Sequence, residues 1–340
     1  MRVLVIGGSQ FLSRAMVVEA LRRGDDVTTF NRGRSGPDLP GVEAVHGDRE
    51  VTADLRRLVA DREWDTVIDV CGSVPANVWE CALLLSGHSR HYTFVSTIRA
   101  HADWPARPVD ERSPLHACPP DATEGEPWVL KAGCERAVEQ FFDGDVLIIE
   151  PGVIIGPYEH VGRLPWWLTR ISRGGPVLAP GHPDREMQLI DARDIASFTL
   201  ARAGEGGAGR FVTSGVPGSA TFGSWLGACV EATGPGAELV WVPDRVLRDH
   251  DVQPLFELPL WLPDGPEFAG AWLTSPAKAL AAGLTCRPVA ETVRDTWQWL
   301  RGIPEGERSF GTAHVSHGID ANKEARILAA WRHEANTAGP

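Results

Sequence analysis

Apolar runs and helix-like stretches alternate over the first 150 residues. The run at 3–6 is followed at once by two glycines and then by apolar residues at helical spacing over 11–21, which predicts a strand, a tight turn and a helix. Further strands are predicted at 26–31, 42–46, 64–71, 92–96 and 146–150. Because parallel neighbours need crossover connections, this alternation predicts an α/β fold with a Rossmann-like doubly wound parallel sheet.

The turn after the first strand has the residue types that accept a phosphate. A helix N-terminus carries unpaired N–H groups and partial positive charge, and Gly7 allows a pyrophosphate to approach the backbone. A full dinucleotide fingerprint has glycine at 7, 10 and 13, whereas this chain has Gly7, Gln10 and Ser13. The turn predicts nucleotide binding, and an ordinary buried strand–helix turn is the alternative.

The end of the second strand indicates which cofactor would bind. It reads Asn31-Arg32-Gly33-Arg34 and contains no carboxylate. An acidic residue there would hold the ribose 2′-hydroxyl, whereas arginine accommodates a 2′-phosphate, so we expect NADP(H) to be favoured over NAD(H). Asp48, in the next loop, either accepts a hydrogen bond from the adenine amino group or caps the following helix. A solvated basic loop is the alternative for Arg32 and Arg34.

The pattern becomes less regular after residue 150, which predicts a second, smaller part. We expect a dinucleotide-binding domain over 1–150, to which 186–214 returns. Residues 151–185 and 215–302 are expected to form a C-terminal α/β substrate domain. The remaining segment, 303–340, is expected to be an extension that contains a helix.

Composition and charge restrict the partners. The formal net charge is -12 and the pI is about 5.4, so the chain has no basic footprint for nucleic acid or an anionic membrane, and a small-molecule substrate is expected. No stretch of about 18 uninterrupted apolar residues is present, and we expect a cytoplasmic protein. Six cysteines show no ligand spacing, so we expect no metal.

Several short motifs occur together in a fixed order from residue 1 to about 300. They are Gly7-Gly8-Ser9-Gln10-Phe11-Leu12, Phe30-Asn31-Arg32-Gly33, Gly47-Asp48-Arg49, Val95-Ser96-Thr97, Lys131-Ala-Gly-Cys-Glu135, Pro151-Gly152 and Ile190-Asp191-Ala-Arg-Asp194. In this combination the chain resembles the NAD(P)-dependent epimerase/dehydratase family, and is most similar to its extended or atypical short-chain dehydrogenase/reductases.

The resemblance implies an NAD(P)-dependent oxidoreductase that acts on a small hydroxyl, carbonyl or imine compound. In the family a Ser or Thr after the fifth strand, a Tyr, and a Lys four residues beyond that Tyr carry the chemistry. Thr97 and Lys131 match the first and last, but Pro127 stands at the Tyr position and cannot donate a proton. The candidate replacement donors are Tyr158, His101 and Glu126.

The resemblance also implies which residues touch the cofactor. Besides Lys131, they are Gly7, Ser9, Gln10, Phe11, Leu12, Asn31, Arg32, Arg34, Asp48, Arg49, Cys71, Ser96, Pro151 and Val153. Nucleotide-sugar members of the family usually carry an Arg-Asp pair where this chain has Met187-Gln188, which weakens a nucleotide-sugar substrate.

The missing tyrosine leaves two alternatives to a reductase open. One is a non-redox cyclase or dehydratase, and the other is a nucleotide-binding regulatory protein without redox turnover. A related branch, the chloroplast stem-loop RNA-binding proteins, has similar motifs, but the acidic charge opposes RNA binding. A homodimer is a further expectation.

Overall fold

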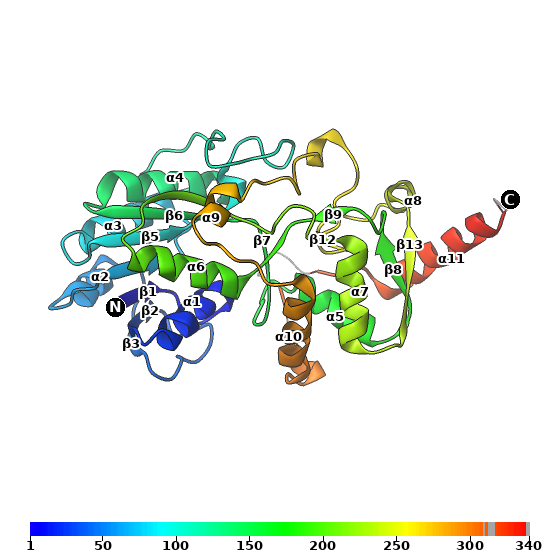
Figure 1. The fold of residues 1–340 in the computed structure, drawn as a ribbon, viewed down its shortest axis with the longest axis horizontal. Helices are drawn as coiled ribbons and strands as arrows, with labels where there is room; N and C mark the ends of the chain where they lie inside the picture. The colour runs from blue at the N-terminus through cyan, green and yellow to red at the C-terminus, as the bar shows by residue number, and fades with distance from the viewer. Residues whose placement is uncertain (309, 312–316, 338–340) are drawn as a thin grey trace.

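The larger part of the molecule is built on one seven-stranded sheet (Figure 1). The structure is a computed structural model that describes residues 1–308, 310–311 and 317–337. The sheet has the order β11-β6-β5-β4-β1-β2-β3, with every neighbouring pair parallel. Its strands are β1 (Arg2–Ile6), β2 (Asp26–Asn31), β3 (Glu43–His46), β4 (Thr66–Asp69), β5 (His91–Val95), β6 (Asp145–Pro151) and β11 (Gly209–Thr213). The predicted doubly wound sheet is confirmed, and its strand order reverses at β1, where such folds bind ligands.

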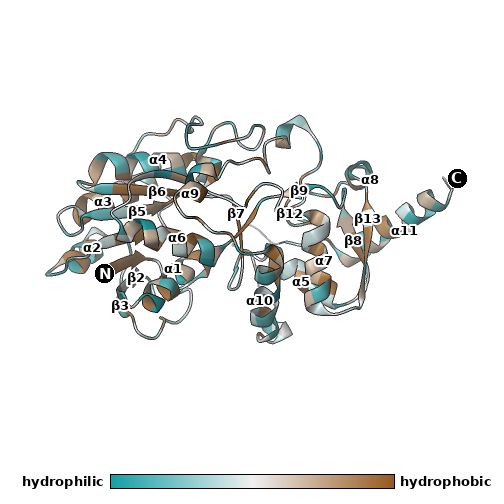
Figure 2. Cartoon of the chain, in the orientation of Figure 1, coloured by the Kyte–Doolittle hydropathy of each residue, from teal (hydrophilic) through white to brown (hydrophobic). Residues whose placement is uncertain are grey.

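Helices cover both faces of this sheet. One face carries α1 (Phe11–Arg22) and α6 (Ala192–Gly204), and the other carries α2 (Thr52–Val59), α3 (Pro75–Leu85) and α4 (Pro127–Phe141). In β1, Val3 and Val5 pack in the cluster under α1 and α6, whereas Leu4 and Ile6 pack under the other three helices. Burial on both faces explains the unbroken apolar runs, which are brown in Figure 2.

The smaller part contains a parallel pair of strands surrounded by helices. The pair is β8 (Gly175–Pro180) and β13 (Ala237–Val242). The helices are α5 (Arg163–Ser172), α7 (Phe222–Thr233), α8 (Asp244–Asp249), α10 (Val289–Arg301) and α11 (Ala321–Thr337). Trp167, Trp225 and Trp261 are fully buried in its core. Among the residues that the structure describes, no helix is long and apolar enough to cross a membrane.

The remaining elements are short. They are β7 (Val153–Ile155) paired with β10 (Leu189–Asp191), β9 (Glu186–Met187) paired with β12 (Ala220–Thr221), α9 (Ala277–Ala281) and the 3-10 turns η1 (Ile98–Ala100), η2 (Pro266–Phe268) and η3 (Glu305–Glu307).

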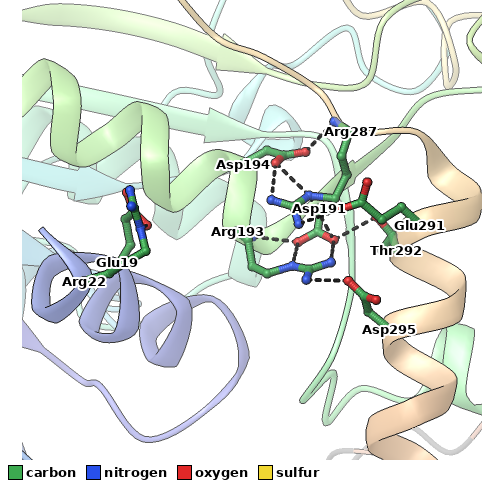
Figure 3. A network of polar contacts seen from close by, with 9 residues as sticks. All are labelled: Glu19, Arg22, Asp191, Arg193, Asp194, Arg287, Glu291, Thr292 and Asp295. Carbon is green, nitrogen blue, oxygen red and sulfur yellow. Dashed lines mark hydrogen bonds and ion pairs between the residues drawn. The ribbon is translucent and has the colours of Figure 1, made fainter.

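A polar network joins α6 to α10 at the junction (Figure 3). Asp191 caps α6 by accepting from the Arg193 N–H at 2.8 Å, and it also accepts from Thr292 Oγ1 of α10 at 2.8 Å. Asp194, on the first turn of α6, pairs with Arg287 at 2.7 Å. These carboxylates hold α6, which packs on α1, against the smaller part.

Candidate functional site

A cavity of about 290 Å³ opens at the carboxyl ends of β1, β2, β3 and β4. Its lining comes from the glycine turn and from the loops that follow β2, β3 and β4. The predicted cofactor residues in this lining are Gly7, Ser9, Gln10, Asn31, Arg32, Arg34, Asp48, Arg49 and Cys71. The fold therefore brings together residues from four separate loops, at the edge of the sheet where ligands of this architecture bind.

The glycine turn makes a cradle that a side chain would fill. Gly7 has a φ of +119°, and a Cβ placed on it would lie 3.3 Å from Ser13 Cβ, so only glycine suits this close contact between turn and helix. Gln10 is the N-cap of α1, and its Nε2 donates to Ser35 O at 3.3 Å. Its side chain thus bridges to the loop after β2, and the geometry fits a pyrophosphate at the start of α1.

The loop after β2 is shaped by Asn31 and edged by two arginines. Asn31 Nδ2 donates to Gly7 O at 3.2 Å, and its Oδ1 accepts from the Gly33 N–H at 2.7 Å. Arg32 and Arg34 are exposed and line the cavity. Within the described part of the chain, neither guanidinium has a hydrogen bond or an ion pair. Two unneutralised cations at a cavity rim favour an anionic group of the ligand.

The Arg49 guanidinium is held by a buried carboxylate. Arg49 Nη1 and Nη2 donate to Asp69 Oδ1 and Oδ2 at 2.8 and 2.9 Å, and Asp69, at the end of β4, is fully buried. Asp69 also accepts from Tyr92 Oη at 2.9 Å and from the Gly72 N–H at 3.0 Å. Burial on its own would raise the pKa of Asp69, but the Arg49 charge outweighs it and lowers that pKa.

The ion pair with Asp69 limits the contacts that Arg49 can make with a ligand in the cavity. Both terminal nitrogens of its guanidinium are directed at Asp69, so its side chain shapes the cavity floor. The sequence reasoning missed Asp69, although a carboxylate that ends an otherwise apolar run is a usable signal.

Lys131 and Thr97 both lie at the carboxyl end of β5. Lys131 Nζ, on α4, donates to Val95 O at 2.8 Å, and burial lowers its pKa. Thr97 caps η1, and its Oγ1 accepts from the Arg99 N–H at 3.3 Å. Pro127 is exposed at the first position of α4, one turn before Lys131. Proline suits that position because the first N–H of a helix has no partner within it.

The three candidate proton donors occupy different environments. His101 is fully buried, with Nδ1 3.1 Å from Ser113 O and Nε2 3.2 Å from Glu150 Oε1. Tyr158 is 44% exposed, and the Arg14 guanidinium stacks on it with Cζ 4.2 Å from the centroid of the Tyr158 ring. Glu126 is exposed at the N-cap of α4. Tyr158 and Glu126 can thus reach solvent, whereas His101 faces protein acceptors.

Other predicted contacts lie around these groups. Phe11 and Leu12 bury their side chains, so any contact they make with a cofactor is through the backbone. Pro151 is buried at the end of β6, and Val153 is half-buried in β7. Cys71 lies after β4, where burial raises the pKa of its thiol.

A buried ionic network that the sequence reasoning missed lies behind Ser96. Ser96 Oγ donates to Glu135 on α4, and Glu135 shares the guanidinium of Arg210 with Glu150, which is 2.6 Å from Arg210 Nη1. Glu135 and Glu150 are both fully buried. Burial, together with the neighbouring Glu150 charge, raises the pKa of Glu135 to about 7.

Comparisons with known proteins agree with this geometry. No protein-family model matches the chain. The enzyme WbmH of Bordetella bronchiseptica, solved in complex with NAD+, superposes with a TM-score of 0.66 at 18% identity, covering 88% of this chain and 98% of that one. UDP-glucose 4-epimerase of Thermotoga maritima, solved with UDP-glucose, gives 0.66 at 17% identity, covering 89% and 99%. The chain therefore has the same fold as these two enzymes.

One curated protein is similar to the chain in sequence. The chloroplast stem-loop binding protein of 41 kDa b from Arabidopsis thaliana is 24% identical over 256 residues, which is 70% of this chain. The match covers 65% of that protein's length. The resemblance to epimerases and dehydratases is thus confirmed at the level of the extended short-chain dehydrogenase/reductase fold.

The buried network makes stability depend on pH in a testable way. The pKa of Glu135 is raised from 4.5 to about 7, so the stabilisation from its neutral form is complete below pH 4.5 and is lost as the pH rises through 7. Each unit between the two values corresponds to about 1.4 kcal/mol. We expect Glu135→Gln to unfold at a melting temperature that falls less than that of the wild type between pH 5 and 8.

The control for this measurement is Glu139→Gln. Glu139 lies 3.1 Å from the same Arg210 but is 44% exposed. Thermal unfolding profiles of Glu135→Gln and the wild type that run parallel across this pH range would contradict the assignment.

Proposed function

We propose that this protein is an NAD(P)-dependent enzyme of the epimerase/dehydratase class, acting on a small hydroxyl, carbonyl or imine compound. One observation carries the proposal: the cavity at the switch point is lined by Gly7 and edged by Arg32 and Arg34, which lack a partner in the described residues. WbmH, which shares the fold, was solved with NAD+ bound.

NADP(H) is the cofactor that this cavity favours. The N–H groups at the start of α1 would hold the pyrophosphate, and Arg32 and Arg34 would hold the ribose 2′-phosphate. No acidic residue ends β2 to hold a free 2′-hydroxyl. When bound, the nicotinamide supplies hydride transfer, while the protein supplies orientation and charge.

The chain's own groups at the end of β5 would act on the substrate. Thr97 Oγ1 can hold a substrate oxygen. Lys131 would contact the nicotinamide ribose, and burial lowers the pKa of its ammonium group. Tyr158 and Glu126 are the exposed candidates for the proton donor, and Glu126 directly precedes Pro127 at the N-cap of α4.

The substrate is smaller than a nucleotide sugar. Gln188 stands where nucleotide-sugar members usually carry a charged pair, and it is buried. Its Nε2 donates to Gly215 O and Thr274 O at 3.0 and 2.8 Å, and its Oε1 accepts from the Thr274 N–H at 2.8 Å. Its amide is therefore committed to the protein, which leaves no ligand group at that position.

A second function is favoured by Pro127. A chain with the cofactor cavity but without the tyrosine could hold the nucleotide for non-redox cyclisation or dehydration, or as a regulatory signal. The net charge of -12 opposes RNA as the ligand in either case.

Calorimetric titration with NADPH, NADP+, NADH and NAD+ tests the proposal. We expect the two phosphorylated forms to bind more tightly than the other two. Failure of all four to bind would overturn both the enzyme and the nucleotide-binding alternatives, whereas tighter binding of NAD+ than NADP+ would overturn the role of Arg32 and Arg34.

A further inference from the structure

An arginine without a counter-ion stands beside the predicted catalytic threonine. Arg99 lies in η1, two residues after Thr97, and is exposed. Its guanidinium stacks 4.4 Å from the ring centroid of Trp128 and 5.7 Å from that of Trp104. In the described ranges of the chain no carboxylate pairs with it.

The position of this cation relates it to the groups proposed to react. Trp128 follows Pro127 on the first turn of α4, and Lys131 lies one turn further along the same helix. Thr97 Oγ1 accepts from the Arg99 N–H. The stacked guanidinium therefore links the turn after β5 to the first turn of α4.

The smaller part of the molecule also reaches this place. Trp104 Nε1 donates to Ala271 O at 3.4 Å, and the Gly270 N–H donates to Pro105 O at 2.9 Å. The loop after η1 and the segment after η2 are thus joined by hydrogen bonds. The Trp104 ring, which stacks on Arg99, is therefore also hydrogen-bonded to the segment after η2.

Stacking on indole fixes the plane of a guanidinium and leaves its N–H edge free. Such cation–π contacts contribute about 0.5–2 kcal/mol, and the planar fork matches the geometry of a carboxylate or a phosphate. A purely structural stack would not require the cation to remain unneutralised. Arg99 thus differs from ion-paired arginines such as Arg22 and Arg57, and it shares with Arg32 and Arg34 a guanidinium that has no carboxylate partner in the described residues.

We propose that Arg99, stacked on Trp128 and Trp104, binds an oxyanion of the substrate. The substrate is then a small acidic molecule whose carboxylate or phosphate lies close to its reacting carbon. This inference rests on the proposed function for the place of reaction. The oxyanion site itself needs no cofactor.

Site-specific modification of the full chain tests the site directly. Phenylglyoxal reacts with arginine side chains, and peptide mass mapping gives the rate at each one. At constant ionic strength we expect malonate or inorganic phosphate, at about nine times its Kd, to slow the reaction at Arg99 by about tenfold. The anion that protects at the lower concentration distinguishes a carboxylate from a phosphate substrate.

Arg56, an exposed arginine of α2, is the matched control. Unchanged reaction at Arg99 with both anions, or equal protection of Arg56, would overturn the proposal. Trp128→Ala should weaken the protection at Arg99 while leaving NADPH binding by calorimetry unchanged. Because protection is measured without cofactor, protected Arg99 in a protein that binds no nucleotide would overturn the proposed function and leave the oxyanion site standing.

Discussion

Asp69→Ala is expected to destabilise the protein by about 3–5 kcal/mol, the usual cost of leaving a buried charge without its partner. Asp69 is fully buried and receives two hydrogen bonds from Arg49. It also accepts from Tyr92 Oη and from the Gly72 N–H. The substitution would leave all these donors unsatisfied beneath the proposed cofactor cavity. Equilibrium unfolding in urea measures the change in the free energy of unfolding.

The control is an ion pair on the surface of the same part. Arg22 pairs with Glu19 at 2.7 Å on α1, and the Arg22 side chain is 69% exposed (Figure 3). Arg22→Ala should produce no resolvable change, because water replaces an exposed partner. If Asp69→Ala unfolded at the same urea concentration as Arg22→Ala, the buried pair would not have the role assigned to it.

The double variant Arg32→Ala with Arg34→Ala is expected to lose about 10–100-fold in affinity for NADPH. A hydrogen bond to a charged group contributes about 1.5–3 kcal/mol, which converts to that range. Both arginines line the cavity and have no partner in the described residues, so their removal does not unpair any other group. Affinity for NADH should stay the same, because NADH carries no 2′-phosphate. Calorimetry with each nucleotide measures both values.

Arg56→Ala, on α2, provides the matched control for this variant. Arg56 does not line the cavity, so the loss of its positive charge reports the general electrostatic effect of removing an arginine. An equal loss of affinity for NADPH and NADH in the double variant would assign the arginines to the shared pyrophosphate. No loss with either nucleotide would remove them from the site.

The sheet could be predicted from the sequence because its central strands β1, β4 and β5 are buried on both faces. The strand predicted at 26–31 is β2 (Asp26–Asn31), and the strand predicted at 92–96 is β5 (His91–Val95), shifted by one residue. Apolar runs that alternate with helical stretches along a chain are typical of buried parallel strands. Their carboxyl ends then placed most of the predicted cofactor residues around one cavity without any knowledge of side-chain contacts.

Side-chain partners could not be predicted in the same way. Asp69 and Arg49 are 20 residues apart, and Glu135 and Arg210 are 75 residues apart, so no local pattern relates them. His101 resembled a replacement donor in the sequence, yet the structure turns it toward Glu150 inside the protein. The direction of each of these side chains is decided by which buried charge needs a partner.

Gln10 illustrates a smaller gap of the same kind. In the sequence its side chain stood where the fingerprint has glycine, which weakened the prediction of a phosphate cradle. In the structure the amide reaches across to Ser35 O, so the turn keeps its open backbone. The contact depends on Ser35 in the loop after β2, which lies 25 residues further along the chain.

The most direct test of the account uses only half of the cofactor. Adenosine 2′,5′-bisphosphate carries the 2′-phosphate that Arg32 and Arg34 are proposed to hold, and adenosine 5′-monophosphate lacks it. We expect calorimetric titration of the wild-type protein to show that the bisphosphate binds at least about tenfold more tightly, a difference of ~1.4 kcal/mol. Equal binding of the two, or tighter binding of the monophosphate, would contradict the central claim that this cavity is built for NADP(H).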